Sequence, residues 1–228
     1  MKHKKWVISL GGSRIIDDGN VDYNFLRKFE KILKKHKSEK FVVVTGGGGT
    51  ARFYIKALKK LGESRRKQSM AGIAVTRLHA SLLMRLFGRN ANEVLPKNME
   101  KVKNLLNKNQ VVFCGALRWK DKNTSDGTAA DLAGFLECLF INITNVLGVY
   151  TSNPKTNKNA KFLKKISWKK FNDMAQKIKF HAGQHFVLDQ SAARKIMKKK
   201  IPTYIIGSLD DLDNILSGRK FKGSLICG

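Results

Sequence analysis

The sequence predicts a single α/β domain, a three-layer α/β/α sandwich built around a mostly parallel central sheet. Three observations support this prediction. Short apolar runs alternate with segments of helical periodicity, as they do in repeated βαβ units. Two of these runs pass directly into glycine-rich turns. The chain has 228 residues, 42% of them hydrophobic, and only three prolines, so its length suits one large domain and no proline-rich linker divides it.

The apolar runs predict the strands and the helical periods predict the helices. The expected strands are 6–10, 41–45, 111–113, 139–143, 203–206 and 225–227. The expected helices are 21–36, 51–61, 72–87, 99–106, 128–136 and 191–199. Segment 153–170 is polar and rich in lysine and asparagine, so we expect it to be a loop. Right-handed crossovers between parallel strands then place helices on both faces of the sheet.

Positive charge is the most unusual feature of the composition. Lysine and arginine total 45 against 17 aspartate and glutamate residues, which gives a formal net charge of +28. Such a balance favours polyanionic partners, either nucleic acid or nucleotides. The lysines interleave with the apolar positions of the predicted helices, and no RNP, zinc-finger or helix-turn-helix signature occurs. A solvated lysine-rich surface is therefore the favoured interpretation, a basic groove stays open, and nucleic acid is not the expected partner.

Cysteine usage and hydropathy constrain the location. Cys114, Cys138 and Cys227 are widely spaced and none belongs to a CxxC or Cys/His cluster, which argues against a disulfide framework or a zinc site. No uninterrupted apolar segment reaches the roughly 18–20 residues that span a bilayer. The apolar stretch 6–10 is shorter than the about 7–15 residues of a signal peptide. We expect a cytoplasmic protein without a membrane partner.

Two glycine-rich turns are the strongest functional signal. Gly11-Gly12-Ser13 follows the first predicted strand, and Gly46–Gly49 follows the second. Turns without side chains at the carboxyl ends of parallel strands let backbone N–H groups approach an anion, and a helix N-terminus adds a favourable dipole. Neither turn is a GxxxxGK[ST] or GxGxxG motif. A glycine pair is equally explained by a tight turn, but four consecutive glycines exceed that need, so we expect the second turn to bind phosphate.

Two later segments carry polar residues with alternative interpretations. In segment 123–130, Thr124 or Ser125 can cap a helix, and Asp126 lies in its first turn. Asp126 either complements the helix dipole or holds a lysine or magnesium ion at the mouth of a phosphate site. In segment 143–154, Tyr150 and Pro154 either flank a purine or serve in packing and in a turn.

Taken in order, these elements resemble the amino acid kinase family, and within it the archaeal-type uridylate (UMP) kinases. The resemblance runs from residue 6 to the end of the chain. Its motifs are GGS at 11–13, GGGxxAR at 46–52, GIxxTRxxAxLL at 72–83, TSDGTAA at 124–130, ITNVxGVYTxxPK at 143–155 and a D-xx-AA-KI-like pattern at 189–196.

The resemblance implies a reaction and an organisation. The reaction is phosphoryl transfer from ATP to UMP, giving UDP and ADP in pyrimidine nucleotide biosynthesis, with Mg²⁺ required. The N-terminal part of the single domain, about 1–140, would bind the acceptor, and the C-terminal part, about 141–228, would bind ATP. The family forms homo-oligomers, hexamers among UMP kinases, and Arg77 would lie on the helix near the subunit contact.

The resemblance also assigns residues to the site by position. The residues expected to bind ATP are Ser9, Leu10, Gly11, Gly12, Ser13, Gly47, Arg52, Thr144, Tyr150 and Asn153. Those expected to bind UMP are Gly46, Ser69, Ala116, Leu117, Arg118, Thr124 and Ser125. Asp126 matches the family's organising aspartate and would serve catalysis together with Gly12 and Ser13. No residue is assigned as a direct metal ligand.

Several positions depart from the family pattern, mainly on the nucleoside and acceptor side. Ser9 stands where many members have lysine, and Ser69 stands where an acidic residue holds the nucleoside. Leu147 and Asn153 stand where aspartates are usual. The loop at 115–126 lacks the family's second glycine and proline, and its cations either contact phosphate or are simply solvated. Two alternatives therefore stay open: a family kinase with another small phosphate or carboxylate acceptor, and a non-catalytic nucleotide- or nucleic-acid-binding relative.

Overall fold

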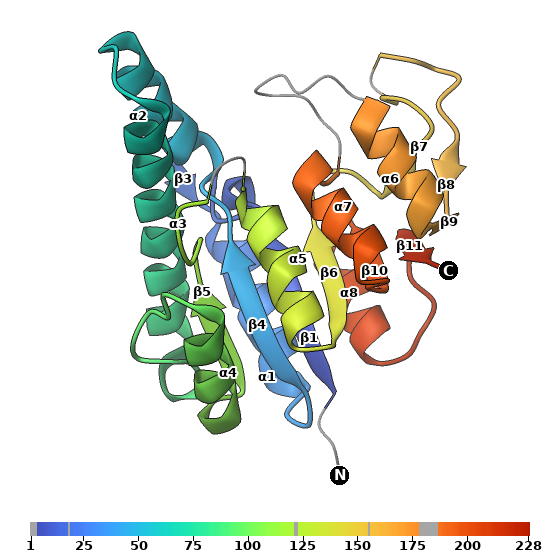
Figure 1. Ribbon diagram of the computed structural model, residues 1–228. Coiled ribbons are helices and arrows are strands. Elements are labelled where there is room, and N and C mark those ends of the chain that lie inside the picture. Colours follow the sequence, from blue (N-terminus) through green and yellow to red (C-terminus); the bar gives the residue numbers. More distant parts are fainter. Residues whose placement is uncertain (1–3, 18, 121–122, 155, 178–186) are drawn as a thin grey trace.

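The computed structural model describes residues 4–17, 19–120, 123–154, 156–177 and 187–228. A seven-stranded sheet runs through its centre (Figure 1). In sheet order the strands are β5 (Val111–Cys114), β4 (Lys40–Thr45), β1 (Lys5–Leu10), β6 (Leu139–Ile143), β10 (Thr203–Ile206), β11 (Ser224–Cys227) and β9 (Lys165–Ser167). The first five strands are parallel, β11 is antiparallel to β10, and β9 is parallel to β11. The predicted mostly parallel sheet is confirmed.

Helices cover both faces of this sheet, which confirms the three-layer architecture (Figure 1). One face packs against α4 (Met99–Lys108), α5 (Ser125–Phe135), α6 (Trp168–Lys177) and α7 (Gln190–Lys198). The other face packs against α1 (Tyr23–Lys35), α3 (Arg65–Phe87) and α8 (Leu209–Leu216). Alternation along β1 explains the two cores, because Val7 faces the first and Trp6 and Ile8 face the second.

Helix α2 (Gly48–Lys60) extends beyond the sheet and packs on α3 near the carboxyl ends of the strands (Figure 1). It buries only Ala51 among its residues. Two short hairpins complete the fold, β2 (Ile16–Asp17) with β3 (Asn20–Val21), and β7 (Val149–Tyr150) with β8 (Phe162–Leu163). Most of the polar side chains discussed below lie near the carboxyl ends of the parallel strands.

Some element boundaries differ from the predictions. Helix α2 begins within the glycine run at Gly48 rather than at residue 51, and α3 begins at Arg65 rather than at residue 72. The first turns of α3 are polar and therefore lack the apolar periodicity that the prediction used. Ser64 nevertheless caps this helix by accepting a hydrogen bond from the Lys67 N–H.

Segment 153–170 was wrongly predicted to be only loop. It contains β8, β9 and the first residues of α6. Strands of two and three residues are too short to show an alternating pattern, which explains the error. Helix α8 was also missed, although Ser208 caps it and its leucines and isoleucine recur at helical spacing.

Helix α3 and the turn after it, Arg65–Asn90, are long and apolar enough by length and composition to cross a membrane. The prediction had considered only uninterrupted apolar runs, and this helix carries several arginines. Its residues Ala80, Leu83 and Phe87 are buried in the core beneath β4 and β5. Core helices of globular proteins pass the same test, and the packing of α3 identifies it as one of them.

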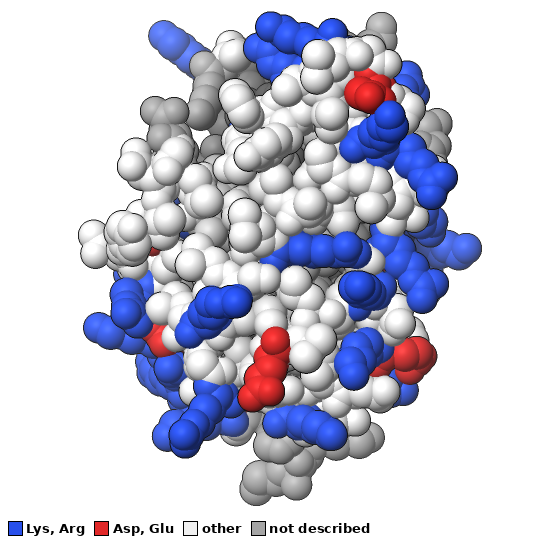
Figure 2. Space-filling view, turned by 90° about the vertical axis from the view of Figure 1, so that its left-hand side faces the viewer, with Lys and Arg blue, Asp and Glu red and all other residues white. Residues whose placement is uncertain are grey.

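The positive charge is spread widely over the face that carries α2 and α3. Figure 2 shows lysine and arginine side chains scattered around this face, a few acidic side chains among them, and an uncharged band between. The exposed apolar residues of these two helices are Phe53, Tyr54, Met70, Leu78 and Leu82. On this face the distribution supports a solvated lysine-rich surface rather than a single basic patch.

Candidate active site

The two glycine turns lie side by side because β1 and β4 are neighbouring parallel strands. Leu10 and Thr45, the last residues of these strands, pair in the sheet. The first turn continues as a short 3₁₀ helix, Gly12–Arg14, and the second opens α2. The two turns meet backbone to backbone, since a Cβ atom added at Gly12 would lie 2.2 Å from the Gly48 nitrogen. Only glycine allows this approach.

The second turn presents the uncapped N-terminus of α2. Gly47 is its N-cap residue and makes no side-chain cap, and Gly48 has φ of +58°, which favours glycine. The first N–H groups of a helix have no partners within the helix, so they attract an anion. Arg52 is exposed on the first turns of α2, where it adds positive charge. This end of α2 has the chemistry of a phosphate site.

Gly47 also has a packing role that the sequence did not reveal. A Cβ atom there would lie 2.4 Å from the Cβ of Ala51. A valine at this position would therefore disturb the start of α2 as well as any ligand, and the substitution cannot separate binding from folding. Gly49 has open space around it, since the nearest atom to an added Cβ would be Nη2 of Arg52 at 3.9 Å.

Asp126 lies beside the first turn. It is in the first turn of α5, and its Oδ1 accepts a 2.6 Å hydrogen bond from Oγ of Ser9, a buried residue of β1. Burial and the nearby negative charge of Asp189 together raise the pKa of Asp126 to about 7, while the hydrogen bond from the Ser9 hydroxyl opposes the shift. A carboxyl with this pKa gains from an adjacent cation, which would return it to the ionised form.

A polar network joins the start of α5 to α7. Thr124 caps α5 by accepting from the Gly127 N–H at 3.0 Å, and its hydroxyl also donates to Asp189. Asp189 in turn caps α7 through the N–H groups of its first residues. On α7, Lys195 Nζ donates to the Gly127 carbonyl at 2.9 Å and to Oδ2 of Asp131 at 2.7 Å. Asp126 is thus held both by its own hydrogen bond from Ser9 and by the contacts that tie the start of α5 to α7.

The loop after β5, expected to hold the acceptor, is anchored on α3. Arg77 donates to the carbonyls of Ala116 at 3.3 Å and Leu117 at 2.7 Å. The Ala116 N–H donates to Oγ1 of Thr76 at 3.0 Å, and Oγ1 of Thr45 donates to the Thr76 carbonyl at 2.7 Å. Arg77 was expected near a subunit contact, and the structure adds that it holds this loop.

A cavity of about 540 Å³ lies below the same loop. Its lining includes Leu117 and Arg118, both expected to bind UMP, and residues of α4 and α5. The full lining is Asn98, Met99, Glu100, Leu117, Arg118, Trp119, Lys120, Asn123, Thr128 and Asp131. The ring centroid of Trp119 lies 5.6 Å from the guanidinium carbon of Arg66, and this cation–π contact also holds the loop against α3.

Arg14 is a residue that the sequence analysis missed. It closes the 3₁₀ helix of the first turn, and its Nη2 donates to the carbonyls of Thr144 at 2.8 Å and Gly207 at 2.9 Å. These carbonyls follow β6 and β10, so one guanidinium joins the carboxyl ends of three strands. Its position directly after GGS was the only signal in the sequence.

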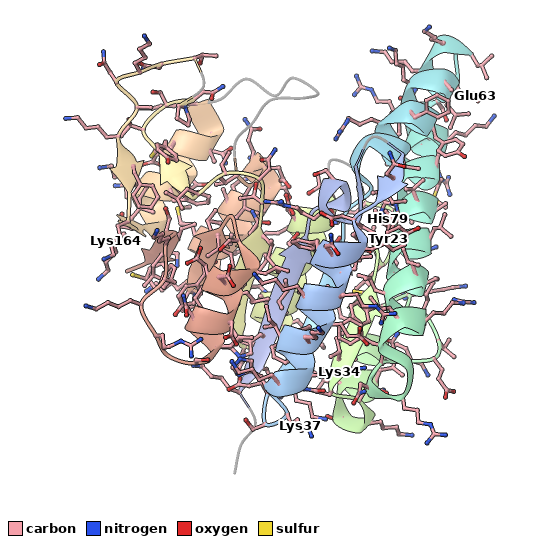
Figure 3. The ribbon with its side chains drawn as sticks, turned by 180° about the vertical axis from the view of Figure 1, so that it is seen from behind. Tyr23, Lys34, Lys37, Glu63, His79 and Lys164 are labelled. Atoms are coloured by element: carbon pink, nitrogen blue, oxygen red, sulfur yellow. The ribbon has the colours of Figure 1, made fainter. Side chains whose placement is uncertain are left out.

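The residues expected to take the adenosine lie on the β6 side of the turns. Thr144 follows β6, and Tyr150 lies in β7 with its ring 5.4 Å from that of Phe162. Asn153 is exposed in a turn, where its carbonyl accepts from the Asn157 N–H. Lys164, from the basic segment after this turn, is at the outer edge of the molecule in Figure 3.

The other predicted site residues differ in how exposed their side chains are. The side chains of Leu10 and Ala116 are buried in the core, so their backbone atoms are what a ligand would meet. Ser13 is exposed after the first glycine pair, and Ser69 is exposed on α3, one turn before the glycine at which α3 approaches Gly47. The structure brings Ser9 and Asp126 into contact, and Gly12 and Gly46 likewise.

Two glycine turns meet backbone to backbone beside a half-buried carboxyl, where the parallel strands of an α/β protein end, and this arrangement is chemically suited to phosphate groups. The model of the amino acid kinase family matches residues 4–207. The chain therefore belongs to the amino acid kinase family.

Curated relatives and solved structures agree with this assignment. The chain is 36% identical over 217 residues to the uridylate kinase of Archaeoglobus fulgidus, with 95% of each chain covered. It is 34% identical to the uridylate kinase of Thermococcus onnurineus, with 96% of this chain and 98% of the relative covered. The crystal structure of the Archaeoglobus enzyme superposes with a TM-score of 0.85 over 97% of this chain and 99% of that one. The UMP kinase of Ureaplasma parvum, 20% identical and with a TM-score of 0.81, shares the fold.

Proposed function

We propose that the protein is a uridylate kinase, which transfers the γ-phosphoryl group of ATP to UMP and forms UDP and ADP. One observation carries the proposal: the two glycine turns meet at the ends of β1 and β4 with Asp126 beside them. Phosphoryl transfer needs donor and acceptor phosphates at a fixed separation and positive charge around them. Two neighbouring anion sites made of backbone N–H groups meet the first requirement. The substrate is inferred from the archaeal relatives, which are named uridylate kinases.

We assign ATP to the first turn and the β6–β7 side, and UMP to the second turn and the loop held by Arg77. This assignment moves Gly47, which the resemblance gave to ATP, to the acceptor, because Gly47 belongs to the second turn. The N-terminal part, about 1–140, then binds the acceptor and the C-terminal part binds ATP. Gly12 and Ser13 face the transferred group with their backbone, and Arg52 at the start of α2 neutralises phosphate charge. Asp126 orients the cations that surround the phosphates.

Magnesium is proposed as the cofactor, held mainly by the phosphate oxygens of ATP. Within the described part of the chain no group of three or more His, Cys, Asp or Glu side chains could hold a metal ion. The carboxyl of Asp126 is nevertheless of the oxygen type that Mg²⁺ prefers, and a cation beside it would lower its raised pKa and favour the ionised form. Bound there, Mg²⁺ would reduce the charge on the transferred group.

We also propose a homo-oligomer in the cytoplasm. The apolar side chains on α2 and α3 support an assembly, because Phe53 is 71% exposed and Leu78 is 64% exposed. Replacing Leu78 with lysine should then reduce the sedimentation coefficient without unfolding the chain. The three cysteines are free, which suits a reducing compartment.

A coupled assay of ADP release tests the function. The panel of acceptors is UMP, CMP, isopentenyl phosphate and N-acetylglutamate, each with Mg·ATP. We expect UMP to give the highest kcat/KM. A higher kcat/KM with another acceptor would move the protein to a different activity of the same family. If no acceptor gives ADP release while calorimetry still shows ATP binding, the protein is a non-catalytic relative.

A further inference from the structure

His79 is a buried histidine that the proposed reaction does not yet use. It lies on α3, is 1% exposed, and its Nδ1 is 2.8 Å from the carbonyl oxygen of Gly46 in the second glycine turn (Figure 3). Its other ring nitrogen, Nε2, is buried and has no hydrogen-bond partner among the residues that the structure describes. An unpaired buried nitrogen of this kind calls for a physical reason.

The contact defines the tautomer of the ring. A carbonyl oxygen only accepts hydrogen bonds, so Nδ1 carries the hydrogen and donates it to Gly46. In this tautomer Nε2 carries a lone pair rather than a hydrogen.

The contact also completes the restraint of Gly46. Its N–H donates to the Leu10 carbonyl at 2.8 Å, and its carbonyl accepts from His79. The described chain contains no cis peptide bonds, and in a trans peptide the C=O and the following N–H point in opposite directions. His79 therefore sets the direction of the Gly47 N–H, which points away from α3.

Helix α3 holds this turn at two successive positions of one face. Thr76 accepts from Thr45 through its carbonyl, and His79 donates to Gly46 three residues later. The same Thr76 holds Ala116 of the acceptor loop. One helix face thus fixes the second turn and the acceptor loop relative to each other.

We propose that His79 is a positioning residue for the acceptor: its Nδ1–H holds the Gly46 carbonyl and so aims the Gly47 N–H of the second turn at the phosphate of the acceptor nucleotide. This inference rests on the proposed function, because it takes the second turn as the acceptor site. It explains why a ring with one unpaired nitrogen occupies a core position, since the useful nitrogen is Nδ1.

Two amide variants separate this role from simple packing. In His79→Asn the side-chain NH₂ occupies nearly the place of Nδ1, and in His79→Gln it occupies nearly the place of Nε2. Both variants are polar and of similar volume, so they keep the core comparably filled. His79→Leu removes both nitrogens. Ser81→Ala is a control on the same helix, because Ser81 Oγ donates only to the carbonyl of Arg77 within α3.

The measurements are KM for UMP, KM for ATP and kcat of the full chain. We expect His79→Asn to stay within about twofold of the wild type, and His79→Gln and His79→Leu to raise KM for UMP about five- to tenfold, the effect of one lost hydrogen bond. KM for ATP should change by less than about twofold in all variants. Equal behaviour of the Asn and Gln variants, or equal increases of both KM values, would overturn the positioning role.

Long-range ¹H–¹⁵N NMR spectra of the histidine rings give a readout that does not depend on activity. We expect His79 to be the Nδ1–H tautomer in the wild-type protein. The Nε2–H tautomer would overturn the inference even if UMP is phosphorylated. A wild-type protein that shows the Nδ1–H tautomer but fails to phosphorylate UMP would instead overturn the proposed substrate, and calorimetric titration of the variants with whichever acceptor the panel identifies would then decide the role of His79.

Discussion

The hydroxyl of Ser9 donates a 2.6 Å hydrogen bond to the carboxyl of Asp126, and this contact joins the central strand β1 to the first turn of α5. Because Ser9 occupies the position where many family members carry lysine, the carboxyl meets a neutral donor here. The positive charge that the proposed reaction needs would then come from other residues of the site. The consequence is measurable in both activity and stability.

Replacing Asp126 with asparagine should lower kcat by orders of magnitude, because an amide cannot orient cations as a carboxylate does. The control is Asp210→Asn. Asp210 also lies in the first turn of a helix, α8, but it pairs with Lys28 on the surface. Steady-state kinetics should show no change in the control. Wild-type turnover in Asp126→Asn would show that the carboxylate has no role in the reaction.

The same substitution should raise stability in a pH-dependent way. Burial raises the pKa of Asp126 to about 7, so the folded protein favours the protonated form. The wild type therefore loses stability as the pH rises from about 4, the unfolded value, to about 7. An asparagine is always neutral and avoids the loss, by roughly 1–3 kcal/mol at pH 8. Thermal unfolding should show a higher Tm for Asp126→Asn at pH 8 and almost none of this gain at pH 4.

Replacing Gly12 with alanine should destabilise the protein and abolish ATP binding. The added Cβ would lie 2.2 Å from the Gly48 nitrogen, so one turn must move away from the other. We expect a loss of about 1–3 kcal/mol, as for other overpacked sites. Gly49→Ala is the matched control for stability, since its Cβ would enter open space and alanine favours helix by up to about 1 kcal/mol. Urea unfolding of the two variants should give changes of opposite sign.

Replacing Lys195 with methionine should loosen α5 from α7. Nζ of Lys195 binds the Gly127 carbonyl and Asp131, and the side chains of the ion pair are 18% and 20% exposed. Losing one partner of a largely buried pair leaves the carboxylate uncompensated, and we expect a cost of about 1–3 kcal/mol. Lys198→Met, on the exposed face of the same helix, should change the free energy of unfolding by less than about 0.5 kcal/mol. Equal effects of the two substitutions in urea unfolding would contradict the role of Lys195.

Asp213 should contribute stability that disappears in acid. Hydrogen bonds from Lys35, His36 and Arg219 hold the pKa of Asp213 well below its usual range, Lys35 having the largest effect. A group with a lowered pKa stabilises the fold above its unfolded value of about 4 and loses this contribution as the pH falls further. Asp213→Asn should therefore lower Tm at pH 7, and the difference in Tm should shrink progressively as the pH falls below about 4. A Tm difference that is constant over this range would refute the assignment.

The sequence was sufficient for the parallel core of the fold and for the identity of the two turns. Apolar runs such as 41–45 are buried on both faces, which leaves a clear signal in a single sequence. Strand β11 was predicted at 225–227, but its antiparallel direction and the short β9 were not, because direction and pairing depend on contacts with distant parts of the chain. Family resemblance placed Asp126, and only the structure showed its partner Ser9.

The remaining site residues were hidden for a physical reason. Arg14, His79 and Lys195 act through backbone carbonyls that become neighbours only in the folded chain. A carbonyl is present at every residue, so no residue type marks the position of the acceptor. Side chains that bind carbonyls therefore leave little trace in a sequence, whereas glycines that permit close approach leave a visible cluster.

The contact between Gly12 and Gly48 has a consequence for how the protein tolerates change. No side chain separates the turns, so the spacing between the two proposed phosphate sites is set by backbone atoms alone. Replacing neighbouring side chains can alter which nucleotide is held, but it leaves the distance between the sites the same. This architecture allows the surrounding sequence to diverge, as the 31–36% identities to its archaeal relatives illustrate, while the fold is retained, with a TM-score of 0.85 to the Archaeoglobus structure.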